Sequence, residues 1–449
     1  MDKKRILLCL CRMGGGEMKY IEEAFADNWV VPLGPNVNGF EADLQRFLAS
    51  GPDAARLDKP MPETCYTGDE FRAYQVAHTL EAPAGKHIVA LSAGTAAVHL
   101  ALVACGVQPG DEVMVQSFTF SASANPVRYL GATPVFIDSE PLTWNMDPVL
   151  LDRAIGERTR LTGRKPKAII AVYLYGMPGL IDELIAVARK WDIPLIEDAA
   201  EAFGSRYAGR CCGTFGRYGV LSFNGNKMIT TSGGGALVCN DDADAGRIKF
   251  LATQARENYP YYQHEEIGYN YRMSNICAGI GRGQMEVLDE HIAHHRHVQA
   301  LYRELLGEVP GITLHDNPRP EIDSNFWLCA ATLDEGTHIK GEEHAYSQAT
   351  EGAVGGAAAT TRAASSTHTA AEPDAAVEAL RLALNAENIE SRPLWKPMHL
   401  QPVFAASPRF GGAVCQSLFR RGICLPAGPW VTDEDVRRIV GCISDAIVR

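Results

Sequence analysis

The sequence predicts an α/β protein in which a large domain with a mostly parallel central sheet, flanked by helices, precedes a smaller C-terminal α/β domain. Two observations support this prediction. The 449 residues are too many for one simple core, so we expect one large domain and a smaller one. Between about 86 and 240, short β-branched runs alternate with helical patterns, which is typical of strands joined by helices in one parallel sheet.

The clearest strand–helix–strand unit lies in the middle of the chain. "KAIIAVYLYG" (167–176) has the composition of a buried strand, and "LIDELIAVARKW" (180–191) has one apolar helical face. "IPLIEDAAEAFGS" (193–205) then returns as a strand that ends near Asp198. Because parallel sheets bind ligands at the carboxyl ends of their strands, Asp198 and Glu201 stand where chemistry is expected.

The predicted border between the domains lies at the start of a long helix. We expect the large domain over 18–285, and "EVLDEHIAHHRHVQALYRELLGEV" (286–309) begins the small domain, which continues to residue 449. The region from about 340 to 376 is rich in Ala, Thr, Gly and Ser, so it predicts a flexible low-complexity insertion. Residues 50–85 predict a second surface insertion.

Composition excludes several classes of function. Lys and Arg total 42 and Asp and Glu total 54, so the net charge is −12. An acidic chain without a basic stripe does not favour nucleic acid or an anionic membrane as partner. The 12 cysteines show no paired spacing, which indicates reduced, mostly buried thiols. The basic start and short apolar run lack a signal-peptide cleavage site, so we expect a cytoplasmic protein.

Four histidines in the predicted helix 286–309 invite a metal-site hypothesis. No acidic partner follows them at ligand spacing, so we predict no metal and a solvated helix face instead. The residues are His291, His294, His295 and His297.

A lysine between two strand-like runs is the main candidate for covalent chemistry. In "VLSFNGNKMITTSGGGALV" (220–238), Lys227 is flanked by glycines, and it is either a surface charge on a turn or a buried amine. Upstream, "LSAGTAAVHLALVACGV" (91–107) has Ser92, Gly94 and Thr95 before an Ala-rich helix. Free N–H groups at such a helix start bind anions, although a simple N-cap gives a similar pattern.

An aromatic pair follows in "QSFTFSASANPVRYLGATPVFID" (116–138). Phe118 and Phe120 are two apart and therefore share one face of an extended segment. One ring could cover a flat cofactor, and core packing is the alternative.

Together these features predict a pyridoxal 5′-phosphate (PLP) site. Lys227 would form a Schiff base with the aldehyde, and Asp198 would keep the pyridine nitrogen protonated. The helix start at Gly94 and Thr95 would bind the phosphate, with a hydroxyl from Ser222. A PLP- or sugar-nucleotide-binding regulator without turnover is the alternative from another class.

The chain resembles the DegT/DnrJ/EryC1/StrS sugar aminotransferases, which have the aspartate-aminotransferase-like fold of PLP fold type I. The resemblance covers nearly the whole chain outside the two insertions. It rests on "SAGTAAVHLAL", "SFTFSASANP", "PVFID", "LYG", "IEDAAEAFGS", "SFNGNKMITTSGGG", "GYNYRMSNICAGIG" and "RPLWKPMH". Within the family it is most similar to the 4-aminotransferases of the bacillosamine pathway, through "MGGGEMKYIEEAFADNWVVPLGPNVNGFE", "TQARE" and "ESRPLWKPMHLQPVF".

The resemblance implies a reaction and an assembly. A homodimer with shared active sites would move the amino group of L-glutamate to C4 of a UDP-2-acetamido-2,6-dideoxy-hexos-4-ulose, giving a UDP-4-amino sugar for glycan biosynthesis and protein glycosylation. Another nucleotide-linked 3- or 4-keto sugar remains open, because cofactor motifs do not identify the sugar.

The resemblance also implies roles for particular residues. Phe120 would stack on the cofactor ring, Glu201 would lie near the ring hydroxyl, and Asn270 would reach the phosphate bound by the other subunit. For the sugar diphosphate, we predict a contact from "SRPLWKPMH", and a packed loop is the alternative. The candidate residues are Arg392, Trp395, Lys396 and His399.

Overall fold

The computed structural model describes residues 3–49, 86–348 and 372–448. The insertion predicted at 50–85 and most of the one predicted at about 340–376 lie outside these ranges. The edges of the second prediction are wrong, because η4 (Glu342–His344) and α11 (Ala345–Gln348) form within it and α12 (Ala375–Ala386) begins before its end. Apolar side chains of these helices explain their order: Ala345 in α11 and Val377 in α12 are buried in the core of the smaller unit described below.

Eight strands of the described residues form the central sheet, in the order β1-β9-β8-β5-β4-β2-β3-β14. Neighbours from β8 to β14 are parallel, whereas β9 is antiparallel to both β1 and β8. The predicted mostly parallel sheet is thus confirmed. The strands are β1 (His87–Leu91), β2 (Glu112–Gln116), β3 (Thr133–Ile137), β4 (Ala168–Val172), β5 (Leu195–Asp198), β8 (Tyr218–Ser222), β9 (Gly235–Cys239) and β14 (Arg409–Phe410).

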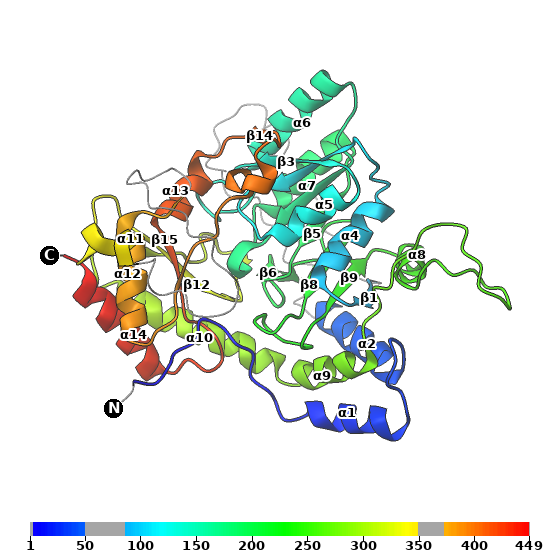
Figure 1. Ribbon diagram of the computed structural model, residues 1–449, viewed down its shortest axis with the longest axis horizontal. Coiled ribbons are helices and arrows are strands. Elements are labelled where there is room, and N and C mark those ends of the chain that lie inside the picture. Colours follow the sequence, from blue (N-terminus) through cyan, green and yellow to red (C-terminus); the bar gives the residue numbers. More distant parts are fainter. Residues whose placement is uncertain (1–2, 50–85, 349–371, 449) are drawn as a thin grey trace.

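Helices cover both faces of this sheet (Figure 1). In β4, Ile169 and Ala171 face one apolar cluster, while Ala168, Ile170 and Val172 face the other, as the alternation of side chains along a strand requires. One cluster includes residues of α2 (Pro35–Ala49), α6 (Pro148–Thr162), α7 (Ile181–Trp191) and α9 (Asn275–Met285). The other includes residues of α4 (Gly94–Ala104), α5 (Asn125–Tyr129) and α8 (Asp242–Ala252). α1 (Glu17–Ala26) packs on α9.

The predicted strand–helix–strand unit is present as β4, α7 and β5. β4 stops at Val172, where η3 (Leu174–Gly176) replaces the end of the predicted strand. β5 ends at Asp198, which is paired in register with Val172 of β4 and Val220 of β8. Asp198 therefore lies at the carboxyl edge of the sheet, where the sequence predicted it.

A second, smaller unit has its own antiparallel sheet, in the order β10-β12-β15-β13. It lies beside the large sheet, and α10 (Leu288–Leu306) runs below both units in Figure 1. Near the N-terminus, Ile6 pairs with Ile389 and packs in the core of this unit. The remaining elements are β10 (Ile312–Leu314), β12 (Cys329–Leu333), β13 (Arg392–Pro393), β15 (Gly422–Leu425), α13 (Ala413–Arg421) and α14 (Asp433–Ala446).

The second unit sends segments back to the first. β14 pairs with β3, the Met398 N–H donates to the Ser117 carbonyl across 2.7 Å, and the Phe404 ring meets Phe136. β11 (Ile322–Asp323) also pairs with β6 (Arg206–Tyr207), which in turn pairs with β7 (Arg210–Cys211). A site near these crossings can draw side chains from both units, and the border at 285/286 stays a prediction.

The prediction that the histidines of α10 form a solvated face is wrong for two of them. His291 and His295 are buried, because this side of α10 packs under the first unit. The His295 Nδ1 is 3.1 Å from the Phe326 carbonyl, and burial lowers the pKa of His295 to about 3. Within the described ranges, no cluster of His, Cys, Asp and Glu could hold a metal ion.

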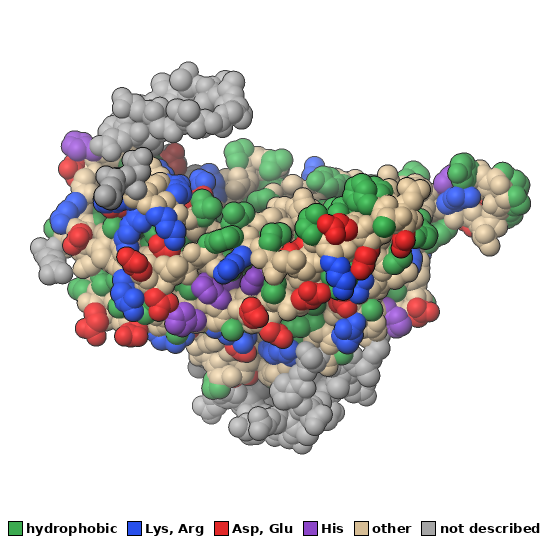
Figure 2. Space-filling view, turned by 90° about the horizontal axis from the view of Figure 1, so that it is seen from below, with side chains coloured by type: hydrophobic (Ala, Val, Ile, Leu, Met, Phe, Trp, Pro, Cys, Tyr) green, Lys and Arg blue, Asp and Glu red, His purple; other side chains and the backbone are tan. Residues whose placement is uncertain are grey.

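The surface below α1 and α10 mixes acidic and basic side chains, with neither sign dominating (Figure 2). None of the helices that the structure describes combines the length and apolar character needed to cross a membrane.

Candidate active site

One cavity of about 340 Å³ lies at the carboxyl edge of the central sheet. This volume is within the range of small-molecule sites in proteins, which begins at about 300 Å³. Eight of the predicted site residues line it, and they come from both units. They are Gly94, Thr95, Phe120, Asp198, Glu201, Ser222, Lys227 and Trp395.

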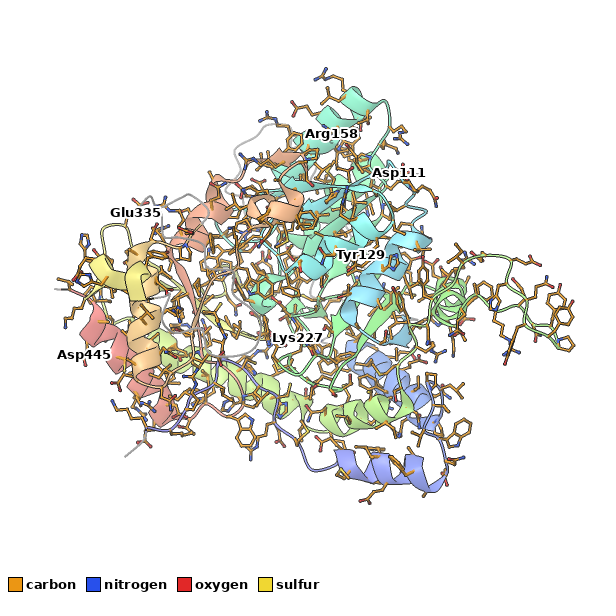
Figure 3. The ribbon with its side chains drawn as sticks, in the orientation of Figure 1. Asp111, Tyr129, Arg158, Lys227, Glu335 and Asp445 are labelled. Atoms are coloured by element: carbon orange, nitrogen blue, oxygen red, sulfur yellow. The ribbon has the colours of Figure 1, made fainter. Side chains whose placement is uncertain are left out.

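Lys227 lies near the middle of the molecule (Figure 3), in the connection between β8 and β9. Its backbone N–H donates to the Asn224 carbonyl across 2.9 Å. Its side chain is only 13% exposed and forms an ion pair with Glu201, with 3.1 Å between Nζ and Oε1. Lys227 Nζ also lies 4.3 Å from the centre of the Trp327 ring. Lys227 is therefore a mostly buried amine and not a surface charge on a turn.

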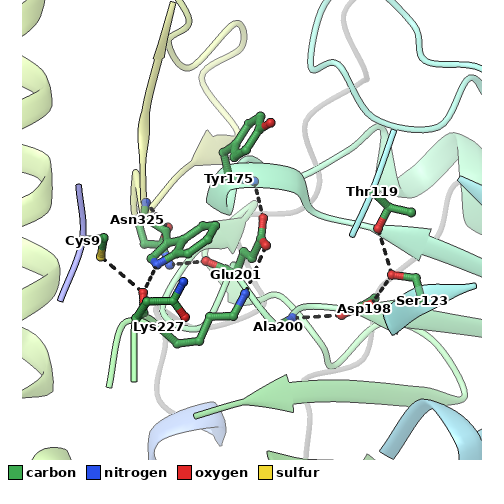
Figure 4. Close-up of polar contacts among 11 residues, drawn as sticks. Cys9, Thr119, Ser123, Tyr175, Asp198, Ala200, Glu201, Lys227 and Asn325 are labelled. Atoms are coloured by element: carbon green, nitrogen blue, oxygen red, sulfur yellow. Dashed lines mark hydrogen bonds and ion pairs between the residues drawn. The ribbon is translucent and has the colours of Figure 1, made fainter. Parts of the chain in front are cut away.

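Asp198 is buried at the end of β5 and held by a chain of hydroxyl groups (Figure 4). Ser123 Oγ donates to Asp198 Oδ2 across 2.6 Å, and Thr119 Oγ1 lies 2.8 Å from Ser123 Oγ. Burial raises the pKa of Asp198, while the bonds from Ser123 and the Ala200 N–H oppose this shift. These donors stabilise the carboxylate and fix its orientation.

Glu201 lies between Lys227 and the backbone of η3. The Tyr175 N–H donates to Glu201 Oε2 across 2.8 Å, while Oε1 accepts from Lys227. Burial raises the pKa of Glu201, and the nearby Lys227 charge opposes the shift.

The start of α4 is open to an anion. Its N-cap residue is Ala93, which provides no side-chain cap, so the first N–H groups of the helix lack an intrahelical acceptor. The simple N-cap alternative is therefore wrong. Gly94 packs closely on Ser222: a Cβ built on Gly94 would be 3.0 Å from the Ser222 Cβ. Backbone amides and the Ser222 hydroxyl thus line the same end of the cavity.

The two phenylalanines do not share one face, so that part of the prediction is wrong. β2 ends at Gln116, and the chain turns into η2 (Ser121–Ser123). Phe118 is fully buried and contacts Tyr175, whereas Phe120 is 58% exposed and lines the cavity beside Trp395, with ring centres 5.4 Å apart.

Four predicted residues do not line this cavity. Arg392 is exposed and pairs with Glu390, and Lys396 is half-buried elsewhere. His399 is buried between Ser117 and Gln416, with ring nitrogens 2.6 and 2.8 Å from their side chains; burial lowers its pKa to about 4. Asn270 is exposed and bridges to Thr253.

The structure also adds residues that the sequence did not identify. Thr119, Ser123, Asn224, Asn226 and Trp327 line the cavity. Trp327 follows β11 in the second unit and has no local motif that marks it. Ser123 lies inside the quoted "SFTFSASANP", but nothing in the pattern indicates a bond to Asp198.

The residues present fit PLP. The amine, the buried acid, the uncapped helix start and the exposed ring of Phe120 line one cavity, and each matches one part of this cofactor. The cavity is compact beside the start of α4, since a Cβ on Gly235 would lie 2.4 Å from the Gly94 nitrogen.

Comparison with known proteins agrees with this chemistry. The DegT/DnrJ/EryC1/StrS aminotransferase family matches residues 67–359 and 343–444. EpsN of Bacillus subtilis (strain 168), named as a pyridoxal phosphate-dependent aminotransferase, is 42% identical over 97% of this chain and 94% of its own. The GDP-perosamine synthase of Caulobacter vibrioides is 32% identical over the full length of both chains.

The fold has a counterpart among solved structures. A DegT/DnrJ/EryC1/StrS aminotransferase from Brucella abortus superposes with a TM-score of 0.74 at 25% identity, covering 96% of this chain and 94% of its own. The chain therefore belongs to the DegT/DnrJ/EryC1/StrS aminotransferase family and is a PLP-dependent sugar aminotransferase.

Proposed function

We propose that this enzyme transfers the amino group of L-glutamate to C4 of a UDP-2-acetamido-2,6-dideoxy-hexos-4-ulose. The product is a UDP-4-amino-4,6-dideoxy-N-acetylglucosamine, a bacillosamine-type sugar made in the cytoplasm for glycan assembly. The observation that carries the transamination is the shared cavity of Lys227, Asp198 and the uncapped start of α4. The sugar assignment rests on the motif resemblance, including Glu201 beside the lysine.

In this proposal, bound PLP supplies an electron-withdrawing ring that stabilises negative charge next to the reacting nitrogen. Lys227 holds the cofactor between turnovers and moves a proton at Nζ during the reaction. Asp198, held by Ser123, keeps positive charge on the ring nitrogen. Gly94, Thr95 and Ser222 bind the phosphate, and Phe120 covers one face of the ring.

Trp395 is the best-supported contact for the sugar nucleotide. It lines the cavity and contacts Phe120 and Tyr175, so an apolar sugar face can pack on it. We propose that Arg392 and Lys396 bind the diphosphate, because they lie in the same segment as Trp395 and carry positive charge. For His399, the buried contacts with Ser117 and Gln416 favour the packed-loop alternative.

A homodimer with shared sites is also part of the proposal. After α8 the chain extends away from the body of the molecule (Figure 1), and Tyr261, Tyr262 and Ile267 on this extension are more than half exposed. Such apolar exposure favours burial against a second copy. Asn270 follows this extension directly, so it is available to the phosphate site of the other subunit.

One specific observation favours a second substrate class. The relative from Caulobacter vibrioides, aligned over the full chain, is named a GDP-perosamine synthase. A GDP-linked 4-keto sugar is therefore the alternative acceptor.

The test is a panel of UDP-, GDP- and dTDP-linked 3-keto and 4-keto sugars with glutamate and PLP. Binding of PLP should give an absorbance band at about 420 nm that glutamate bleaches. We expect NMR of the product to place nitrogen at C4 of the UDP sugar. Amination only at C3, or only of a GDP or dTDP sugar, would contradict the substrate assignment.

A further inference from the structure

Two groups from distant parts of the chain contact the Lys227 amine. The Glu201 carboxylate is 3.1 Å from Nζ. The ring centre of the Trp327 indole is 4.3 Å from Nζ. Trp327 is only 2% exposed, so its ring is desolvated where it meets the cation, and desolvation strengthens a cation–π contact.

Two hydrogen bonds fix the indole in this position. Its ring N–H donates to the Asn226 carbonyl across 2.6 Å, so the ring is hydrogen-bonded to the peptide group that directly precedes Lys227. The Trp327 backbone N–H donates to Asn325 Oδ1 across 2.9 Å. The placement of Trp327 is therefore specified by directional contacts as well as by packing.

Asn325 connects the two groups that contact the amine. Its side-chain Nδ2 donates to the carbonyls of Glu201 and Phe203 across 2.8 and 2.9 Å. The Asn325 side chain fits only because residue 176 is a glycine: a Cβ on Gly176 would lie 1.9 Å from Asn325 Oδ1. One buried amide thus ties the Glu201 loop to the segment that carries Trp327.

We propose that Trp327 is a positioning residue for the Lys227 amine, and that Asn325 sets its distance from Glu201. With PLP bound, the Lys227 amine would be unattached while the substrate occupies the cavity. The negative face of the indole and the Glu201 carboxylate then keep Nζ over the cavity, where it can move a proton and rebind the cofactor. This inference rests on the proposed transamination and adds a role for the second unit within it.

The first test uses the cofactor-free protein, so that it does not depend on turnover. Trace labelling with acetic anhydride is quantified by mass spectrometry for the Lys227 peptide and for the exposed Lys249 as internal reference. Trp327→Leu removes the ring face and should increase Lys227 labelling about 5-fold, whereas Trp327→Phe keeps a ring face and should stay within about 2-fold of wild type. Trp327→Met replaces the Leu variant if that variant does not fold.

Equal labelling of Lys227 in wild type and the Leu or Met variant would overturn the proposal. Equal increases in the Phe and Leu variants would also overturn it, since they would assign the effect to packing or to the indole N–H and not to the ring face.

The second test measures the PLP-loaded enzyme with glutamate and a keto sugar that wild type accepts. Trp327→Leu should lower kcat about 10-fold while the KM for glutamate changes less than about 2-fold, and Trp327→Phe should recover most of kcat. If wild type neither forms the absorbance band nor aminates any sugar, the proposed function fails. If wild type is active and the Leu variant matches it, only the role of Trp327 fails.

Discussion

Ser123 donates its hydroxyl hydrogen to Asp198 across 2.6 Å. This bond orients the carboxylate of the last residue of β5. Removing it in Ser123→Ala should raise the pKa of Asp198 further above its ordinary value, because burial then acts without this donor. We expect kcat to fall about 10-fold, as for the loss of one hydrogen bond to a charged group. Ser121→Ala, in the same short helix but outside the hydroxyl chain, is the matched control. Equal rates for both variants would contradict the assigned role.

Asp198 should also reduce the stability of the cofactor-free protein. Its pKa is raised in the folded state by burial, so its contribution to stability is present below the unfolded pKa and is lost as pH rises through the folded pKa. At pH 7, cofactor-free Asp198→Asn should therefore melt about 1–3 °C higher than wild type. The difference in Tm between this variant and wild type should decrease as pH falls toward 4. Thermal unfolding monitored by circular dichroism measures both Tm values. A Tm of Asp198→Asn at pH 7 that equals or lies below that of wild type would contradict this prediction.

His295 predicts acid sensitivity. Burial lowers its pKa to about 3 in the folded state, so the stability it contributes is present above the unfolded pKa and is lost as pH falls. Between pH 6.5 and 5, wild type should lose about 2 kcal/mol that His295→Gln does not lose. The control is His297→Gln, which alters an exposed ring on the same helix. Denaturant unfolding at several pH values in this interval measures how the free energy of unfolding depends on pH. The same dependence for wild type and His295→Gln would contradict the prediction.

The proposed homodimer with shared active sites predicts complementation between two inactive variants. Lys227→Ala removes the amine, and Asn270→Asp places a carboxylate where the partner's phosphate would bind. Random mixing of refolded subunits makes one intact site in each mixed dimer, so activity should recover to about one quarter of wild type. Each variant refolded alone is the control. If Asn270 acts within its own subunit, no mixture will recover activity.

Local patterns predicted the elements that carry the proposed cofactor-binding residues. The run 193–205 gave a strand ending at Asp198 because a buried parallel strand is a continuous apolar segment, and that strand is β5. Lys227 was predicted between two strands, and β8 and β9 flank it. The glycine-marked helix start at Gly94 is also observed, since its signal lies within a few residues.

Contacts between distant segments were beyond the sequence patterns. Trp327 lies shortly after β11, which pairs with β6, and no periodicity in the sequence indicates such a pairing. His295 lies on a helix with many polar residues, and only tertiary packing buries it. The Tyr173 hydroxyl donates to the buried Glu197 across 2.7 Å, a contact that depends on the neighbouring strand β5.

The central claim is that Lys227 carries the cofactor, and reductive trapping tests it most directly. The purified protein is loaded with PLP, reduced with borohydride and digested, and the modified peptide is identified by mass spectrometry. We expect the added mass on Lys227 in wild type and its loss in Lys227→Ala, with Lys249→Ala as a control that keeps it. Trapping on another lysine in wild type, or unchanged trapping in Lys227→Ala, would contradict the account.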